Sequence, residues 1–162
     1  MEWFARQVMP LLQSTHPDLE FVMYGSAMPD EVKALASDQI RAQGFIEEIS
    51  DAYDRHLIFT APLLSGAGIK GKVLAALAHG VPCVMTPTAA EGIGLRHGHD
   101  CMIVTTPGEW HDAIDALITD PALWHSISQN GRDYVARTFS FETARGQMRT
   151  AFEAVDLYSP EF

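Results

Sequence analysis

A glycine-rich loop between an apolar run and an apolar helix constrains the fold of this chain more than any other feature. Residues 65–82 read SGAGIKGKVLAALAHGVP, and apolar runs of strand length flank the loop-helix unit at Leu57–Leu63 and Val81–Thr86. The small residues Gly66–Gly68 leave the backbone bare where the helix is expected to begin. The segment therefore predicts a strand–helix–strand crossover whose loop lies at the carboxyl end of the first strand, where open α/β sheets bind ligands.

The same loop is predicted to bind an anion, most simply a phosphate. N–H groups at the start of a helix are unpaired and carry partial positive charge, and Lys70 and Lys72 add full charges beside them. Residues 66–72 also fit the G-x-x-x-x-G-K core of a P-loop, but Val73 stands where that motif needs a Ser or Thr for Mg²⁺. The remaining alternative is a glycine turn that only lets a strand meet a helix closely.

Composition favours a globular protein and argues against nucleic acid as a partner. Of the 162 residues 47% are hydrophobic and 20% are charged, and the formal net charge is −10, which argues against nucleic acid as a partner. No apolar stretch reaches the length of a membrane span, so we expect a cytoplasmic protein. Cys83 and Cys101 lie in apolar runs typical of a core, and the seven histidines lack metal-ligand spacing. His97 and His99 could contact a ligand or simply belong to an exposed polar loop.

Apolar periodicity predicts strands that alternate with helices, followed by helices alone. Thr106-Pro107-Gly108-Glu109 is a capping box, and Asp120 and Ser140 are expected to cap the next two helices. We expect helices over 2–13, 29–37, 50–55, 107–118, 121–138 and 141–158, strands over 19–25, 39–46, 57–63, 81–86 and 101–104, and a loop over 87–98. This order predicts an α/β, Rossmann-like, doubly wound parallel sheet with C-terminal helices.

With these elements in order, the chain resembles the C-terminal, donor-binding domain of group 1 glycosyltransferases of the GT-B type, which are retaining enzymes. The resemblance rests on motifs in sequence: P-D-L-E-F at 17–21, Gly44-Phe45, the A-P-L loop-helix with G-A-G-I-K-G-K-V-L, G-V-P-C-V at 80–84, A-E-G at 90–92, and the D-P-x-L, N-G-R and F-S close. It implies a nucleoside-diphosphate sugar as donor substrate, no cofactor and no essential metal, and in a longer parent a peripheral place at the inner membrane.

The resemblance also implies roles for individual positions, although it leaves the catalytic residues unknown. The donor diphosphate would lie on Gly66, Ala67, Gly68 and Ile69, with Lys70 and Lys72 beside it. The base, ribose and sugar would lie near two further groups, which are Gly44, Phe45 and Ile46, and Ala75, Glu91 and Gly92.

Two departures from the family pattern bear on activity. Many members carry glutamates eight residues apart where this chain has Ala67 and Ala75, and the second glutamate holds the ribose hydroxyls; Glu91 is a candidate substitute. The N-terminal acceptor domain and the first, central strand of the donor domain are also absent, so residues 1–162 are expected to form one partial domain that is inactive alone. The strands at 19–25 and 57–63 would flank the gap in the sheet.

Three hypotheses about function remain open at this point. The first is a glycosyltransferase donor domain, and the second is a noncatalytic nucleotide-binding or interaction module, which Ala75 favours. The third is a sugar-nucleotide epimerase on a similar fold, for which no carboxylate pair or histidine set argues. The two strands beside the gap would each expose unpaired backbone groups, so we expect self-association of the fragment or a borrowed strand.

Overall fold

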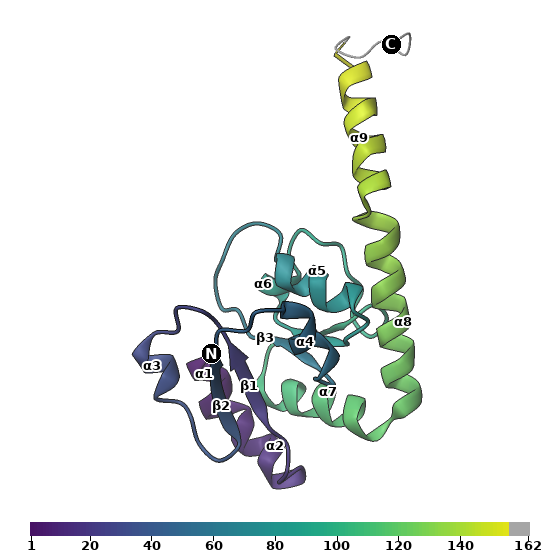
Figure 1. The fold of residues 1–162 in the computed structure, drawn as a ribbon. Coiled ribbons are helices and arrows are strands. Elements are labelled where there is room, and N and C mark those ends of the chain that lie inside the picture. The colour runs from purple at the N-terminus through teal and green to yellow at the C-terminus, as the bar shows by residue number, and fades with distance from the viewer. Residues whose placement is uncertain (156–162) are drawn as a thin grey trace.

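The computed structural model describes residues 1–155 and has the predicted Rossmann-like, doubly wound α/β architecture (Figure 1). All five strands pair in parallel, as the strand–helix alternation predicts. They are β1 (Phe21–Tyr24), β2 (Ile40–Gly44), β3 (Phe59–Ala61), β4 (Cys83–Met85) and β5 (Met102–Ile103). Each observed strand lies inside its predicted range and is shorter than that range.

The strands form two separate parallel sheets. β1 pairs only with β2, in a register that joins Phe21 to Ile40 and shifts by one residue after Met23. The second sheet has the order β3-β4-β5, with Phe59 opposite Cys83. β1 and β3 are therefore not hydrogen-bonded to each other. The gap that the sequence predicts between them is present in the structure.

Helices cover both faces of the sheets, which is why two hydrophobic clusters form. The first cluster packs α1 (Glu2–Gln7), α2 (Met9–Thr15) and α7 (Pro107–Thr119) against β1 and β2, and Trp110 is its largest member. The second cluster packs α4 (Ile49–Asp54), α5 (Gly71–Ala78) and part of α8 (Pro121–Thr138) against β3 and β4. Figure 1 shows α1, α2 and α7 on one side of the strands and α4, α5 and the short helix α6 (Pro87–Ala90) on the other.

Three predictions about the N-terminal and central segments are wrong in detail. The helix expected over 2–13 is two helices that meet at Val8, because Pro10 has no N–H for the carbonyl of Arg6 and its ring crowds that carbonyl. The loop expected over 87–98 contains a one-turn helix, α6 (Pro87–Ala90). Thr86 caps α6 by accepting a hydrogen bond from Ala89 N–H at 3.2 Å. The helix expected over 29–37 shortens to α3 (Asp30–Lys33).

The C-terminal helices follow their predicted caps. The Thr106–Glu109 capping box is confirmed, with Glu109 accepting hydrogen bonds from the N–H groups of Thr105 and Thr106. Asp120 caps α8, and Ser140 caps α9 (Phe141–Glu153). The stretch up to 158, where we expected the last helix to end, lies partly outside the described residues.

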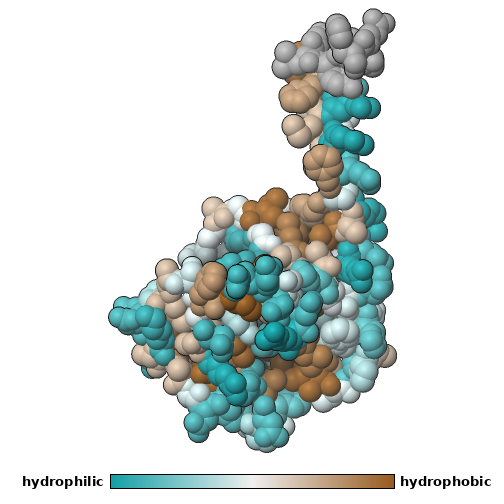
Figure 2. Space-filling view, viewed as in Figure 1, coloured by the Kyte–Doolittle hydropathy of each residue, from teal (hydrophilic) through white to brown (hydrophobic). Residues whose placement is uncertain are grey.

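Helix α9 extends away from the body of the protein and buries none of its residues (Figure 1). Figure 2 shows apolar side chains along one side of α9 and hydrophilic ones along the other. Within residues 1–155, no helix is both long enough and apolar enough to cross a membrane.

Candidate functional site

The glycine loop leaves the carboxyl end of β3 and leads into α5, as predicted, and its backbone is open to solvent. Gly66 and Gly68 have φ angles of +143° and +75°, which favour glycine because a Cβ atom strains this region. Across the described residues, none of the main-chain N–H groups from Leu64 to Lys72 donates an intramolecular hydrogen bond. This run of successive N–H groups is therefore free to bind an anion.

Helix α5 begins later than expected. Lys70 is its N-cap and Gly71 its first residue, so Gly66–Ile69 form a free loop before the helix instead of its first turn. The Val73 N–H bonds to the Lys70 carbonyl at 2.9 Å, which closes the first turn. An anion on the loop would thus meet the N–H groups of the loop and the positive end of the α5 dipole together.

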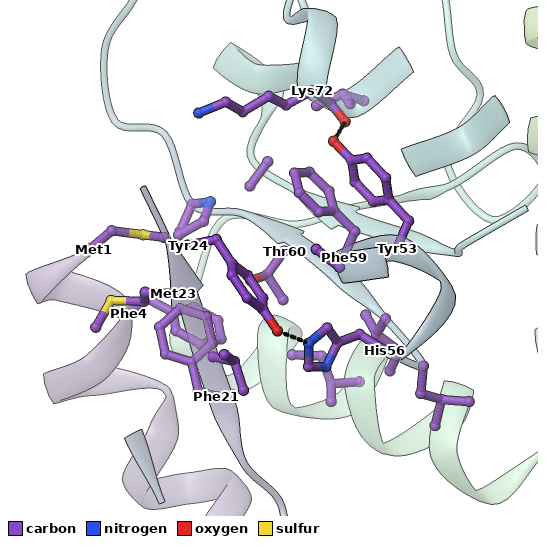
Figure 3. Close-up of a pocket in the computed structure, with 18 of the residues that line it drawn as sticks. Met1, Phe4, Phe21, Met23, Tyr24, Tyr53, His56, Phe59, Thr60 and Lys72 are labelled. Carbon is purple, nitrogen blue, oxygen red and sulfur yellow. Dashed lines mark hydrogen bonds between the residues drawn. The ribbon is translucent and has the colours of Figure 1, made fainter. Parts of the chain in front are cut away.

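The two lysines of the loop have different surroundings. Lys70 donates from Nζ to the Gly68 carbonyl and lies over Gly66, where a Cβ atom would be 3.7 Å from Lys70 Cε. Lys72 has no recorded partner for its Nζ among the described residues, while its carbonyl accepts a hydrogen bond from Tyr53 at 3.3 Å. Figure 3 shows the Lys72 chain extending away from Tyr53. Lys72 is therefore the cation with the greater freedom to reach a ligand.

A second loop lies beside the glycine loop. The hydroxyl of Thr86 donates to the Leu63 carbonyl at 2.6 Å and so joins the ends of β3 and β4. A Cβ atom on Gly92 would be 4.0 Å from Ile69 Cγ1, so the predicted Gly92 does approach the predicted diphosphate loop. Glu91 is exposed and has no recorded hydrogen-bond or ion-pair partner among the described residues.

The remaining predicted positions lie at the end of β2, in the other sheet, and on helix α5. Gly44 ends β2 with φ +80°, and the following Phe45 is 71% exposed. This segment belongs to the other sheet, and no hydrogen bond among the described residues joins it to the glycine loop. Ala75 lies on α5, half-buried against the second hydrophobic cluster. The structure therefore gathers Gly66–Ile69, Lys70, Lys72 and Gly92, but it records no contact between them and Gly44–Ile46.

The Gly/His loop after residue 94 has a structural role that its sequence did not reveal. Asp100 is 1% exposed and accepts hydrogen bonds from the N–H and Nε of Arg96 at 2.9 and 3.1 Å. Burial acts to raise the pKa of Asp100, but its hydrogen bonds to Arg96 and His99 outweigh burial and lower it. His97 accepts the Ile103 N–H at 3.0 Å. Both histidines thus form structural contacts here.

The two cysteines are buried core residues, as their apolar surroundings predict. Burial raises the pKa of Cys83 well above its ordinary value and that of Cys101 to about 12. A thiol in such surroundings stays protonated at neutral pH and is a poor nucleophile.

Comparison with known proteins agrees with this arrangement. The sequence profile of the family described as "Glycosyl transferases group 1" matches residues 1–120. This chain belongs to that family. Over 110 residues it is 32% identical to an uncharacterized 44.6 kDa protein in the cps region of Klebsiella pneumoniae, covering 62% of this chain and 28% of that protein.

Solved structures share the fold at low sequence identity. HepE of Anabaena in complex with UDP and glucose matches with a TM-score of 0.79 and 17% identity, over 94% of this chain and 45% of HepE. The C-terminal domain of the group 1 glycosyltransferase LpcC from Francisella tularensis matches with a TM-score of 0.70 and 23% identity, over 87% of this chain and 82% of that domain. The chain thus spans less than half of HepE, and its match to LpcC is to a C-terminal domain.

Proposed function

We propose that this chain binds a nucleoside-diphosphate sugar as the donor-binding part of a glycosyltransferase. The observation that carries the proposal is the run of unpaired main-chain N–H groups at 64–72, which ends at the start of α5 and has Lys72 beside it. An anion the size of a diphosphate can accept several of these hydrogen bonds at once. The UDP and glucose in the complex of HepE, which has the same fold, support this choice of ligand.

In this proposal the loop also assists the chemical step. When the bond between the sugar and the diphosphate breaks, negative charge develops on the leaving diphosphate. The N–H groups of Gly66–Ile69 and the Nζ of Lys72, with Lys70 as a second cation, would stabilise that charge with little reorganisation. The base would lie towards Gly44–Ile46, and the ribose and sugar towards Ala75 and Glu91–Gly92. Transfer would retain the anomeric configuration, need no metal, and require an acceptor-binding domain beyond this chain.

A second candidate function is a noncatalytic nucleotide-binding module. Ala67 and Ala75 favour it, because neither side chain supplies the carboxylate that many family members carry at these places. Two results together would support this second candidate. The chain would bind a nucleoside diphosphate, and a longer protein that contains both this chain and an acceptor-binding domain would not transfer sugar.

The test of the proposal separates the diphosphate from the nucleoside. Calorimetric titration of UDP and of uridine into the wild type and Lys72→Ala should show about tenfold weaker binding of UDP to the variant, which is ~1.4 kcal/mol, and a smaller loss for uridine. Parallel titrations with ADP, GDP and CDP would identify the base. Lys33→Ala is the matched control, because Lys33 on α3 pairs with Asp30. Equal losses of affinity for UDP and uridine would contradict the proposed site. So would a structure of the UDP complex with the phosphates at the start of the helix that Thr106 caps.

A further inference from the structure

Two hydroxyl groups hold the main chain on either side of the glycine loop. Before the loop, Thr86 donates its hydroxyl to the Leu63 carbonyl at 2.6 Å. After the loop, Tyr53 donates its hydroxyl to the Lys72 carbonyl at 3.3 Å, and Figure 3 shows this bond between α4 and the first turn of α5. The N–H groups from Leu64 to Lys72, which donate no hydrogen bond within the described residues, therefore lie between two fixed carbonyls.

Thr86 is itself held firmly where β4 ends. It is 6% exposed, and its N–H donates to the Ala61 carbonyl at 3.3 Å. A threonine hydroxyl carries one proton and accepts with its lone pairs. Here the oxygen accepts the Ala89 N–H at 3.2 Å, and the proton is donated to the Leu63 carbonyl. The hydroxyl therefore cannot turn towards a ligand without breaking a bond to the protein.

The bond from Thr86 sets the direction of the first unpaired N–H group of the loop. Every peptide bond among the described residues is trans, and the C=O and N–H groups of a trans peptide point in opposite directions. The Leu63 carbonyl points towards Thr86, so the Leu64 N–H points away from it. Without the hydroxyl, this peptide would be free to rotate and to present its carbonyl, which carries partial negative charge, to an anion.

The same arrangement recurs inside the loop. Lys70 donates from Nζ to the Gly68 carbonyl, which turns the Ile69 N–H away from that lysine. Side-chain donors thus occupy the carbonyls of Leu63, Gly68 and Lys72, whereas the N–H groups between them stay unpaired within the described residues. Successive N–H groups that are left free in this way form a concavity suited to an anion.

We propose that Thr86 is a positioning residue for the diphosphate site, which fixes the Leu63–Leu64 peptide so that the start of the glycine loop offers an N–H group to the anion. The inference rests on the proposed function and adds to it a buried residue that acts through the loop and does not touch the ligand. Donors that are already oriented do not have to be reordered when the ligand binds, so holding them in place strengthens binding.

The experiment removes the Thr86 hydroxyl and measures the binding of the diphosphate and of the nucleoside separately. Thr86→Val replaces the hydroxyl by a methyl group, and Thr86→Ser keeps the hydroxyl. Calorimetric titration should show about five- to tenfold weaker binding of UDP to Thr86→Val than to the wild type, with uridine unchanged, because only the phosphates meet the loop. Thr86→Ser should bind UDP nearly as tightly as the wild type.

Thr106→Val is the matched control. Like Thr86, Thr106 precedes a proline, caps a helix and accepts the N–H of the residue three positions later. No hydrogen bond among the described residues joins Thr106 to the glycine loop. Both valine variants should melt at a lower temperature than the wild type, since each loses a helix cap, whereas only Thr86→Val should lose affinity for UDP.

A measurement on the wild type keeps the test independent of how the variants fold. When UDP saturates the site, the NMR amide signal of Leu64 should shift. In Thr86→Val this shift should be lost at Leu64 and retained at Gly71, at the end of the loop that Tyr53 holds.

Four results would each overturn the proposal. They are an unshifted Leu64 amide in the wild type, equal affinity of the wild type and Thr86→Val for UDP, equal losses of affinity for UDP and uridine, and an equal loss of UDP affinity in Thr106→Val. A wild type that binds UDP no more tightly than uridine would contradict the proposed function itself, and this inference with it.

Discussion

Gly131→Ala should destabilise the protein although it improves the helix propensity of α8. A Cβ atom at residue 131 would lie 2.7 Å from the Asp100 carbonyl oxygen and 2.7 Å from Leu77 Cδ2. The Asp100 carbonyl cannot shift easily away from a Cβ atom at residue 131, because the Asp100 side chain is buried and accepts a hydrogen bond from the Arg96 N–H. Overpacking costs about 1–3 kcal/mol, and contact with a backbone oxygen places the cost in the upper part of this range, about 2–3 kcal/mol. The gain in helix propensity offsets about 1 kcal/mol of it. We therefore expect a net loss of about 1–2 kcal/mol in the free energy of unfolding.

The matched control is Gly146→Ala on α9, which is also a helix-interior glycine but has nothing within 4 Å of the point that its Cβ atom would occupy. It should gain up to about 1 kcal/mol if the helix propensity acts on global stability. Urea unfolding measures the free energy of unfolding of both variants, provided that its dependence on urea concentration is the same as in the wild type. In calorimetric melting, the loss expected for Gly131→Ala corresponds to a fall of about 2–8 °C in melting temperature for a protein of this size. A Gly131→Ala protein as stable as the wild type would refute the argument that backbone contact at Asp100 requires this glycine.

Three further predictions concern the ribose position, the buried carboxylate and the capping box. Ala75→Glu should strengthen UDP binding by about 1 kcal/mol, since it adds the acceptor that the family uses for the ribose hydroxyls; unchanged affinity in calorimetry would point to another acceptor such as Glu91. The pKa of Asp100 is lower in the folded protein than in the unfolded chain, so its stabilisation is complete above a pH of about 4 and is lost as pH falls through the folded pKa. Asp100→Asn should thus be less stable than the wild type at pH 7 and should lose less stability on acidification. Urea unfolding measures the free energy of unfolding of both proteins at pH 7 and pH 3, and an equal loss in the two proteins between these pH values would exclude this role of Asp100. Thr106→Ala should cost about 0.5–2 kcal/mol in urea unfolding, whereas Thr105→Ala, whose hydroxyl makes no recorded hydrogen bond within the described residues, should cost little.

The sequence alone was sufficient for features that depend on neighbours in the chain. The Thr106–Glu109 capping box, the Asp120 cap and the Ser140 cap were all predictable, because a cap joins residues two or three positions apart. Apolar runs of strand length likewise predicted β1, β3, β4 and β5, since burial in a parallel sheet favours such runs. β2 is the exception, because its predicted segment 39–46 reads QIRAQGFI and alternates polar with apolar residues. The glycine loop was also predictable, because backbone with positive φ angles favours glycine and the loop is rich in that residue.

Short helices and helix starts were less predictable. The division of the first helix at Val8 depends on a proline whose effect competes with apolar periodicity over the whole segment. Helix α6 is held by the Thr86 hydroxyl, which also bonds to Leu63 from a distant part of the chain. The late start of α5 at Gly71 could not be derived from spacing, because Gly66–Gly71 is equally compatible with a loop and with a helical first turn.

Tertiary structure alone decided which loops and strand edges come together. The proximity of Gly92 to Ile69 and the insertion of Gly131 between Asp100 and Leu77 join residues more than twenty positions apart, and no local pattern specifies them. The gap between β1 and β3 could be expected from strand order, but its apolar lining by α1, α2, α4 and α5 became evident only when the helices were placed on both faces. Local hydrogen bonding and periodicity determine which elements form, whereas side-chain volume and backbone pairing across the fold determine where those elements meet.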